Sequence, residues 1–215
     1  MVVGGIVGPI GIQPDWTLHL RDDKHRSFVS YRKGAFSGVM LNTWYYQCVN
    51  GLKWEQPWVN DKLLPRKACW LTLSKTFCPY IYGGHLWANQ CMPGWFREMT
   101  VLVAKACGLD ESNLPNSCNA NFYESGNEVV GWHADNEPLF QATKQDALII
   151  SLSLGATRTF AYRLNAQPSQ VFRLPLGDGD ICTMEGLMQK HYKHAILKEG
   201  SVQASRINLT WRWIV

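Results

Sequence analysis

The strongest chemical signal in this chain lies in the stretch NFYESGNEVVGWHADNE, residues 121–137. Here His133 and Asp135 stand one residue apart, just beyond a short strand-like run. An imidazole and a carboxylate at this spacing can both reach one divalent metal ion from the end of a strand. A third ligand from elsewhere would leave open positions on the metal for a co-substrate and oxygen. The pair therefore predicts a metal site, provided that the chain supplies the third ligand.

The third ligand is expected to be a histidine on a later strand. The segment KHYKHAILKE offers His191 and His194. In a strand over residues 192–196, Tyr192, His194 and Ile196 would share one face. Either histidine could instead be a structural or surface residue, which is the commoner role. We favour His194 as the ligand, because His191 is expected to lie outside the strand.

The last strand-like run, RINLTWRWIV, has a polar and an apolar face. Alternation places four polar side chains on one face, namely Arg206, Asn208, Thr210 and Arg212. A half-exposed edge strand would show the same pattern. Beside a metal site, two guanidinium groups and an amide inside a barrel instead predict a dicarboxylate site, because arginine binds carboxylates in a bidentate manner. Asn121 and Tyr123 alternate onto one face of an earlier strand and could add hydrogen bonds to the same ligand.

The elements that must position these residues are two helices followed by many short strands. Helices are expected at Ala35–Asn50 and Gly94–Cys107 from their apolar spacing and the glycines that follow them. Strands are expected in the lead-in at Ile10–Ile12 and Trp16–Leu20, and then at Cys118–Tyr123, Ala147–Leu154, Thr159–Arg163, Gln170–Pro175, Asp180–Met184, Tyr192–Ile196 and Ile207–Trp213. This order predicts an α+β fold in which a mainly antiparallel double sheet of the jelly-roll type is backed by helices.

Taken together, the motifs N-x-Y, H-x-D-x-E, HYxHAI and R-x-N-x-T-x-R resemble those of the AlkB family of Fe(II)- and 2-oxoglutarate-dependent dioxygenases. PRKACW at 65–70 and PYIYGG at 79–84 look like the nucleotide-recognition lid of nucleic-acid demethylases in that family. SLSLGATRTF at 151–160 and RLPLGDGDICTM at 173–184 fit its strands. The resemblance covers about residues 60–213. It implies one domain with an N-terminal extension containing a helix (1–60), a lid (61–92), and a helix plus a double-stranded β-helix core (93–215).

The resemblance also implies a role for each matching residue. His133, Asp135 and His194 would bind Fe(II). The residues implied to bind 2-oxoglutarate are Asn121, Tyr123, Arg206, Asn208 and Arg212, with Arg206 on the distal carboxylate. The residues implied to contact the substrate are Glu137, Trp70, Tyr82, Arg66, Lys67 and Arg158. Among these, Glu137 would contact the target base, and Trp70 and Tyr82 would stack on it or shape the lid. Arg66 and Lys67 would touch phosphates or shape the lid, and Arg158 would orient groups near the active site.

The implied reaction consumes O2 and 2-oxoglutarate and removes N-alkyl groups from bases such as N1-methyladenine or N3-methylcytosine in DNA or RNA. It releases formaldehyde, succinate and CO2. The base must be flipped out of a duplex or offered by a single strand. Such alkylated bases are cationic, so an acidic contact from Glu137 and an aromatic ring would both stabilise them.

Two other functions are compatible with the same scaffold. One is a dioxygenase acting on a protein side chain or a small molecule; the lid-like segment and the acidic Glu137 argue against it. The other is a binding module with a vestigial iron site. The presence of all three metal ligands and both arginines argues against degeneration.

The composition sets the remaining expectations. A formal net charge of +4 is compatible with a polyanionic partner. No apolar run approaches the ~18 residues of a membrane span, and the apolar start lacks the basic segment of a signal peptide. The seven cysteines include no CxxC pair and are typical of reduced thiols. We therefore expect an intracellular protein of the cytoplasm or nucleus, without a membrane partner and monomeric.

Overall fold

The computed structural model describes residues 9–59, 61–74, 80–82 and 84–215. Before the lid region it contains η1 (Ile10–Ile12), β1 (Thr17–Asp22), β2 (Ser27–Arg32) and α1 (Val39–Gly51). The lid region and second helix comprise β3 (Trp58–Val59), β4 (Lys62–Leu63), β5 (Lys67–Thr72), β6 (Tyr80–Tyr82), β7 (His85–Trp87), β8 (Asn89–Cys91) and α2 (Gly94–Ala106). The remainder comprises η2 (Glu111–Asn113), β9 (Ser117–Tyr123), β10 (Val130–His133), η3 (Pro138–Phe140), β11 (Ala147–Gly155), β12 (Arg158–Leu164), β13 (Val171–Leu176), β14 (Ile181–Gly186), α3 (Met188–His191), β15 (Tyr192–Ile196) and β16 (Arg206–Arg212).

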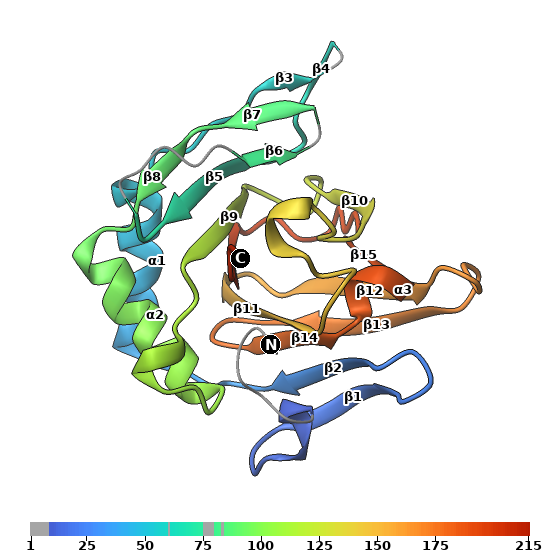
Figure 1. Ribbon diagram of the computed structural model, residues 1–215. Helices are drawn as coiled ribbons and strands as arrows, with labels where there is room; N and C mark the ends of the chain where they lie inside the picture. The colour runs from blue at the N-terminus through green and yellow to red at the C-terminus, as the bar shows by residue number, and fades with distance from the viewer. Residues whose placement is uncertain (1–8, 60, 75–79, 83) are drawn as a thin grey trace.

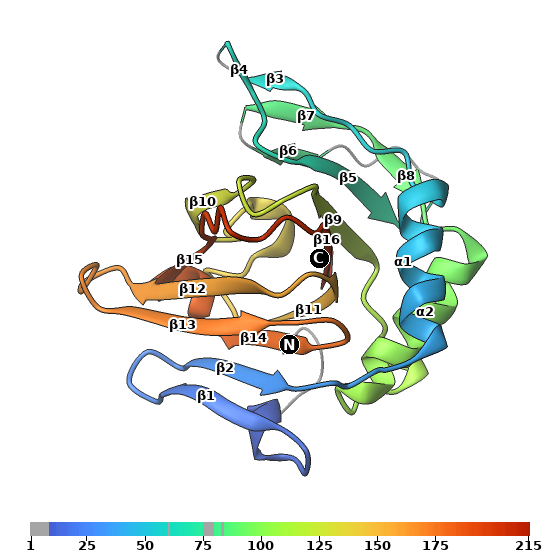
Figure 2. The ribbon, with the colours of Figure 1, turned by 180° about the vertical axis from the view of Figure 1, so that it is seen from behind.

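Two sheets form the body of the molecule (Figures 1 and 2). The major sheet has the strand order β1-β2-β14-β11-β16-β9-β5-β8, and the minor sheet has the order β10-β15-β12-β13. Among the described strands every pairing is antiparallel except that of β5 with β8. This arrangement confirms the expected jelly-roll core. The long helices α1 and α2 lie together on the side of the molecule away from the minor sheet (Figure 1).

The central strands of the major sheet carry apolar side chains on one face and polar ones on the other. In β16, Ile207, Leu209 and Trp211 face the helices and join a hydrophobic cluster that includes Trp44 of α1 and Phe96 of α2. The intervening polar residues face the minor sheet, as the alternation predicts. The helices thus complete one core, and the opposite face of the sheet is left for a polar cavity.

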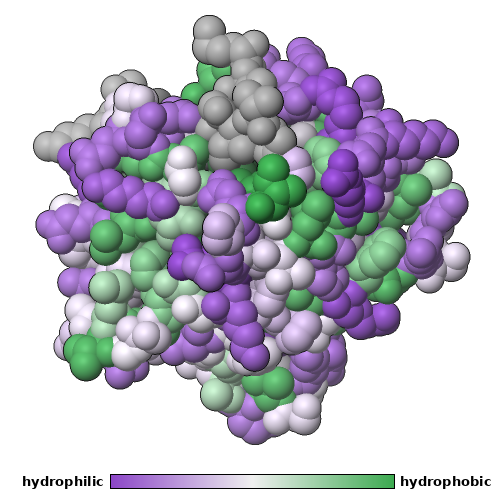
Figure 3. All heavy atoms as spheres, turned by 90° about the horizontal axis from the view of Figure 1, so that it is seen from below, coloured by the Kyte–Doolittle hydropathy of each residue, from purple (hydrophilic) through white to green (hydrophobic). Residues whose placement is uncertain are grey.

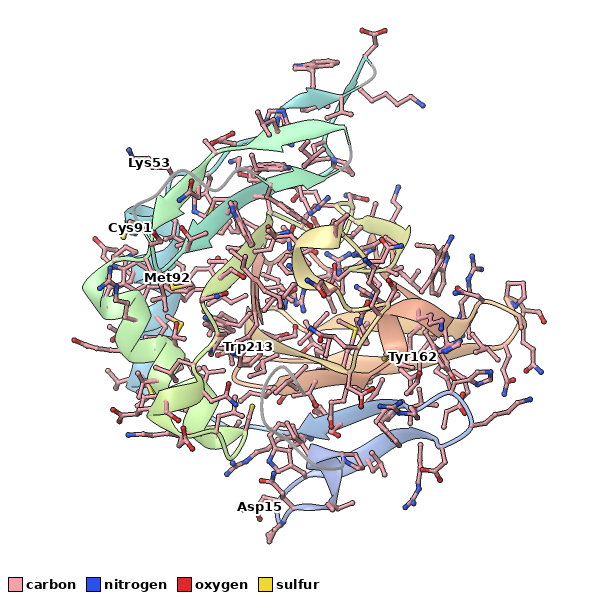
Figure 4. All side chains as sticks on the ribbon, viewed as in Figure 1. Asp15, Lys53, Cys91, Met92, Tyr162 and Trp213 are labelled. Carbon is pink, nitrogen blue, oxygen red and sulfur yellow. The ribbon has the colours of Figure 1, made fainter. Side chains whose placement is uncertain are left out.

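A second hydrophobic cluster fills most of the space between the two sheets. It includes Phe160, Tyr162 and Leu174 from the minor sheet and Met184 from β14. Figure 4 labels Tyr162 of this cluster and Trp213, which belongs to the helix-side cluster. This core holds the minor sheet at a fixed distance from the polar face of the major sheet.

Residues 1–60 were expected to form an N-terminal extension, and the described part of this segment, residues 9–59, contributes strands to the core. Strand β2 pairs along its length with β14, with Ser30 opposite Thr183, so β1 and β2 form one end of the major sheet. The segment Ile10–Ile12, expected as a strand, is a 3-10 turn. Its first backbone N–H donates to the buried carboxylate of Glu185 at 2.8 Å, which ties this turn to the core.

The expected lid, 61–92, is likewise only partly separate from the core. Strands β5 and β8 belong to the major sheet, whereas β3–β4 and β6–β7 form two-stranded sheets of their own. We call these two pairs the lid hairpins; they project from the body in Figures 1 and 2. A small cluster containing Trp70, Tyr80, Trp87 and Phe140 packs the lid onto the core.

The β1 side of the molecule shows hydrophilic and hydrophobic side chains interspersed (Figure 3). Polar side chains along an edge strand such as β1, where the outward residues are largely exposed, discourage pairing with another chain. In the part of the chain that the structure describes, no helix is both long and apolar enough to cross a membrane.

Candidate metal and co-substrate site

A cavity of about 600 Å³, including its open mouth, lies between the polar face of the major sheet and the minor sheet. Its lining combines charged, amide and hydroxyl groups with apolar side chains, and most of the apolar ones come from the minor sheet. The lining residues are Arg66, Asn119, Asn121, Tyr123, Val130, His133, Asp135, Ser151, Phe160, Leu176, Cys182, Met184, His194, Ala195, Ile196, Arg206, Asn208, Thr210 and Arg212. This set contains all three expected metal ligands and all five residues expected to bind 2-oxoglutarate.

His133, Asp135 and His194 come together at one wall of this cavity. Strand β10 ends at His133 and pairs with β15, so that His133 lies opposite His194. One possible ligand atom from each of the three residues lies within 4.8 Å of the others. Two imidazoles and one carboxylate on one side of a metal match the facial arrangement that leaves open positions for further ligands. The donor set therefore fits Fe(II).

The surroundings of the two triad histidines keep their imidazoles neutral, which is the protonation state that binds a metal. His133 Nδ1 lies 2.8 Å from the carbonyl oxygen of Gly131, so Nδ1 carries the proton and Nε2 keeps its lone pair. Burial lowers the pKa of His133, and it lowers the pKa of His194 to about 3. Both imidazoles are therefore neutral at physiological pH.

Asp135 is held ionised by a buried arginine. Arg212 Nη2 lies 2.6 Å from Asp135 Oδ2, and Arg212 Nε donates to the same oxygen at 3.2 Å. Burial would raise the pKa of Asp135, but Arg212 and then the two histidines hold it well below its usual range. Since Arg212 occupies Oδ2, Oδ1 is the oxygen left to a metal. The sequence placed Arg212 on the co-substrate; in the structure its Nε and Nη2 contact Asp135, and its Nη1 has no hydrogen-bond partner among the described residues.

Arg206 is the clearest unsatisfied group of the cavity. Its side chain is 1% exposed, and its Nη2 donates to Ser153 Oγ at 2.9 Å. Its Nε and Nη1 have no hydrogen-bond partner among the described residues. Burial lowers its pKa, yet a guanidinium stays charged, so the cavity contains a buried cation with two unused donors. Such a group is suited to a carboxylate ligand.

The amides of the cavity floor are held in fixed orientations. Asn208 donates to Ser151 Oγ at 2.6 Å and accepts from Thr210 Oγ1 at 3.1 Å. Asn121 accepts from Nε of Arg66, which stands just before β5 and reaches the neighbouring strand β9. These contacts fix the polar groups before a ligand arrives.

Glu137 lies beside the triad and is contacted by the lid. Tyr80 Oη donates to Glu137 Oε1 at 2.7 Å, whereas Oε2 is buried without a hydrogen-bond partner among the described residues. Burial raises the pKa of Glu137, and the neighbouring Asp135 raises it further. An acceptor is therefore available next to the triad for a donor or cation from outside the chain.

Comparison with known proteins identifies the family to which the chain belongs. The model of the 2OG-Fe(II) oxygenase superfamily matches residues 40–212, which is most of the chain. The chain belongs to this superfamily. Its membership accounts for the triad and for the unsatisfied arginine, and it confirms Fe(II), 2-oxoglutarate and O2 as the cofactors that the family implies.

Relatives within this oxygenase superfamily confirm the resemblance to AlkB proteins. The chain is 36% identical over 132 residues to the Mus musculus alpha-ketoglutarate-dependent dioxygenase alkB homolog 3, covering 57% of this chain and 44% of that protein. It is 24% identical over 192 residues to the Arabidopsis thaliana DNA oxidative demethylase ALKBH2, covering 76% of this chain and 59% of that protein. The chain thus matches only about half the length of these curated relatives.

A solved structure of OsALKBH1 shares the fold of this oxygenase. The two superpose with a TM-score of 0.58 at 16% sequence identity, covering 86% of this chain and 96% of that chain.

The structure places the other expected substrate contacts in and around the lid. Trp70 is 1% exposed and stacks on Tyr80 with ring centroids 4.8 Å apart, so it forms the core of the lid rather than an open stacking surface. Arg66 is buried in the cavity wall, away from any surface phosphate. Lys67 is partly exposed and pairs with Glu124 at 2.5 Å. Tyr82 lies in β6, and its side chain is outside the described part of the structure.

Arg158 does not contact the cavity and is a structural residue. The sequence placed it among the substrate contacts. Its guanidinium is buried and donates to backbone carbonyls of Ser125, Glu128 and Leu197, and its Nε lies 3.1 Å from Glu199 Oε2. Each of its three nitrogens therefore helps to join the 125–128 and 197–199 loops to β12. The motif indicated an important arginine, but spacing alone could not show which way its side chain points.

Replacing Arg158 with methionine is expected to destabilise the fold by about 3–5 kcal/mol, because several buried carbonyls and Glu199 would lose their donor. Thermal unfolding should then occur at least about 6 °C lower. Replacement of the exposed Arg21 with methionine is the matched control and should leave the melting temperature within a degree or two. An unchanged melting temperature in the Arg158 variant would contradict the structural role.

Sequence reasoning missed Gln189, a residue of α3 that is hydrogen-bonded to the backbone of the triad member Asp135. Gln189 is 3% exposed, and its Oε1 accepts from the backbone N–H of Asp135 at 2.9 Å. The helix α3 ends at His191, and β15 starts at Tyr192, so His191 lies outside the strand as expected. Gln189 therefore links the segment carrying Asp135 to the segment that leads into His194. No sequence signal singled it out, because glutamine is ordinary in a short helix.

Replacing Gln189 with methionine is expected to weaken divalent-metal binding about 10- to 100-fold, because outer contacts of this kind orient the ligands. Titration of the chain with Co(II), followed by calorimetry and visible absorption, measures both affinity and coordination. Gln203→Met, at an exposed glutamine, serves as the control. Equal Co(II) affinity and an equal spectrum in the two variants would show that Gln189 does not position Asp135.

Proposed function

We propose that this oxygenase removes N-alkyl groups from nucleobases in DNA or RNA, with Fe(II), 2-oxoglutarate and O2, releasing formaldehyde, succinate and CO2. The observation that carries the proposal is the pairing of two unsatisfied groups in one site. Arg206 offers unused donors inside the cavity, and Glu137 offers an unused acceptor beside the triad. The first suits a carboxylate co-substrate, and the second suits a cationic base.

Different residues would bind the iron, bind 2-oxoglutarate and exclude water. His133, Asp135 and His194 would hold the iron, which together with 2-oxoglutarate supplies O2-dependent oxidation of a nearby C–H bond. Arg206 would bind the distal carboxylate of 2-oxoglutarate, with the Tyr123 ring against its guanidinium at 5.4 Å. Asn121 and Asn208 would hold the rest of the molecule. The apolar minor-sheet side of the cavity, including Leu176 and Ile196, would exclude water from the reacting carbon.

The substrate class follows from the charge beside the triad. An N1-methyladenine or N3-methylcytosine ring is cationic, and Glu137 Oε2 would meet that charge without a competing protein partner. Arg212 and Asp135 neutralise each other in their ion pair, so Glu137 is the anionic group left for the substrate. The relatives' names, which include a DNA oxidative demethylase, support the same class.

Two measurements on the full chain test the proposal. Succinate release from 2-oxoglutarate should require Fe(II). Loss of methyl from oligonucleotides bearing N1-methyladenine, made as matched DNA and RNA, should accompany it. Methylated peptides serve as the comparison substrates. Succinate release with methyl loss from peptides alone would overturn the nucleobase assignment and favour a protein substrate.

Replacing Glu137 with glutamine is expected to lower demethylation about tenfold or more, because a charge-assisted contact contributes roughly 1.5–3 kcal/mol. Uncoupled succinate release in the absence of substrate should remain close to the unmodified level. The variant retains an oxygen that can accept from Tyr80, so the lid contact is preserved. Simultaneous loss of uncoupled turnover would instead place Glu137 in the metal site.

A further inference from the structure

The outer face of the minor sheet carries a row of cations. Arg163 of β12 lies directly opposite Lys193 of β15, and Arg173 of β13 lies diagonally next to Arg163, opposite Ala161. The neighbouring residues in these strands, such as Tyr162 and His194, point inward to the core and the cavity. Lys193 and Arg173 are exposed, and Arg163 is half-buried. We call Arg163, Arg173 and Lys193 the basic row.

The basic row has no acidic counterpart. None of its three residues forms an ion pair with any residue that the structure describes. The strands β10 and β15 and the whole hairpin from Arg158 to Leu176 contain neither aspartate nor glutamate, although the chain has 17 of them. Like charges directly opposite each other on a sheet are unfavourable. No acidic side chain among the described residues offsets this cost, which points to an anion from outside.

An aromatic ring extends the row toward the metal site. The guanidinium of Arg163 lies over the ring of Trp132, 4.1 Å from its centroid. Trp132 is half-buried on β10, one residue before the triad member His133. The row therefore runs from the strand that carries a metal ligand across β15 and β12 to β13. In Figures 1 and 2 the long helices lie on the far side of the molecule from these strands, so neither helix covers the row.

We propose that the basic row binds the phosphodiester backbone of the nucleic-acid strand whose base enters the cavity, with Trp132 as a stacking platform for a flanking base. The inference rests on the proposed function. Strands are about 4.8 Å apart, so three neighbouring strands span roughly 10 Å, which matches about three phosphates of a stacked single strand. Cations beside an aromatic ring are the combination that binds single strands without reading their sequence. A lipid surface or an acidic protein would meet the charges but would leave Trp132 without a role.

The test compares two triple variants that remove the same amount of charge. Arg163, Arg173 and Lys193 are replaced with glutamine in one, and the exposed lysines Lys33, Lys53 and Lys105 are replaced with glutamine in the other. Binding of an unmodified single-stranded oligonucleotide is measured by fluorescence anisotropy over a range of salt concentrations. The first variant should bind about tenfold more weakly, and its slope of log affinity against log salt should fall by about 2. The control should keep the affinity and slope of the unchanged chain.

Equal affinity and slope in the two triple variants would overturn the proposal. If the double variant of Arg173 and Lys193 to glutamine, which preserves the Arg163–Trp132 contact, shows no intermediate loss, the row is likewise excluded. A loss confined to binding of phosphatidylserine vesicles would overturn it in favour of a lipid surface. Trp132→Ala should weaken oligonucleotide binding while leaving the salt slope unchanged, because it removes stacking and no charge.

Failure of the proposed function gives a different result from failure of the basic row. Oligonucleotide binding that depends on the row, without methyl loss, would overturn the demethylase activity and leave the interface standing. Methyl loss that is equal in both triple variants would overturn the basic row as an interface and leave the demethylase activity standing. Succinate release without nucleic acid should be unchanged in either variant, since the row does not contact the cavity.

Discussion

Replacing Asp135 with asparagine is expected to abolish turnover, with a loss of more than about a thousandfold, because several kcal/mol of metal-dependent stabilisation would disappear. Asparagine keeps the shape of the side chain but offers the metal a neutral oxygen. Co(II) affinity, measured by calorimetry, should fall together with Fe(II)-dependent succinate release. Asp110→Asn, at the exposed cap of η2, is the control and should retain both.

The same substitution leaves Arg212 as a buried cation without its counter-charge, so part of any loss could come from the fold. The double variant Asp135→Asn with Arg212→Met removes both charges and separates these effects. It should recover the melting temperature but not the Co(II) affinity. Substantial turnover in either Asp135 variant would contradict its assignment as a metal ligand.

Replacing Arg206 with methionine is expected to raise the 2-oxoglutarate concentration needed for half-maximal succinate release roughly 100- to 1000-fold. Loss of a buried charged partner costs at least about 3–4 kcal/mol, and each 1.4 kcal/mol is tenfold. Co(II) affinity without 2-oxoglutarate should be nearly unchanged, because Arg206 contacts no triad residue. A raised 2-oxoglutarate requirement with unchanged Co(II) affinity would show that the substitution impairs co-substrate binding and not metal binding.

Arg206→Lys provides the graded comparison for this prediction. Lysine keeps the charge but not the planar fork, so partial recovery of 2-oxoglutarate affinity is expected. Arg21→Met, at an exposed arginine, controls for loss of a positive charge. An unchanged 2-oxoglutarate requirement in Arg206→Met would show that the ligand binds elsewhere in the chain.

Local sequence patterns predicted the cavity well where strand alternation decides the outcome. The two faces of β16 follow directly from the period of two, and the pairing of β16 with β9 brings Asn208 opposite Asn121. The choice of His194 over His191 follows from the position of the strand start at Tyr192. In each case the backbone alone determines which way the side chain points.

The sequence was misleading where tertiary contacts decide the outcome. Arg158 was expected near the substrate and Arg66 near phosphates or in the lid, yet Arg158 joins two loops and Arg66 lines the cavity. For Trp70 the sequence left open whether it stacks on a base or shapes the lid, and the fold stacks Tyr80 on it within the lid cluster. The pairing of β2 with β14 joins residues about 150 positions apart, such as Ser30 and Thr183, and no local pattern predicts such a pairing. Gln189 acts through a hydrogen bond from the distant backbone N–H of Asp135, which leaves no sequence pattern.

The division of β5 between lid and core has a practical consequence for domain engineering. One face of this strand, with Cys69 and Leu71, belongs to the helix-side core, and the other, with Ala68 and Trp70, belongs to the lid cluster. A chimaera made by exchanging the whole of residues 61–92 with a relative would therefore cut the major sheet beside β9. Exchanging only the lid hairpins β3–β4 and β6–β7 leaves β5 and β8 in register. Substrate preference could then be transplanted between oxygenases without rebuilding the scaffold that holds the co-substrate.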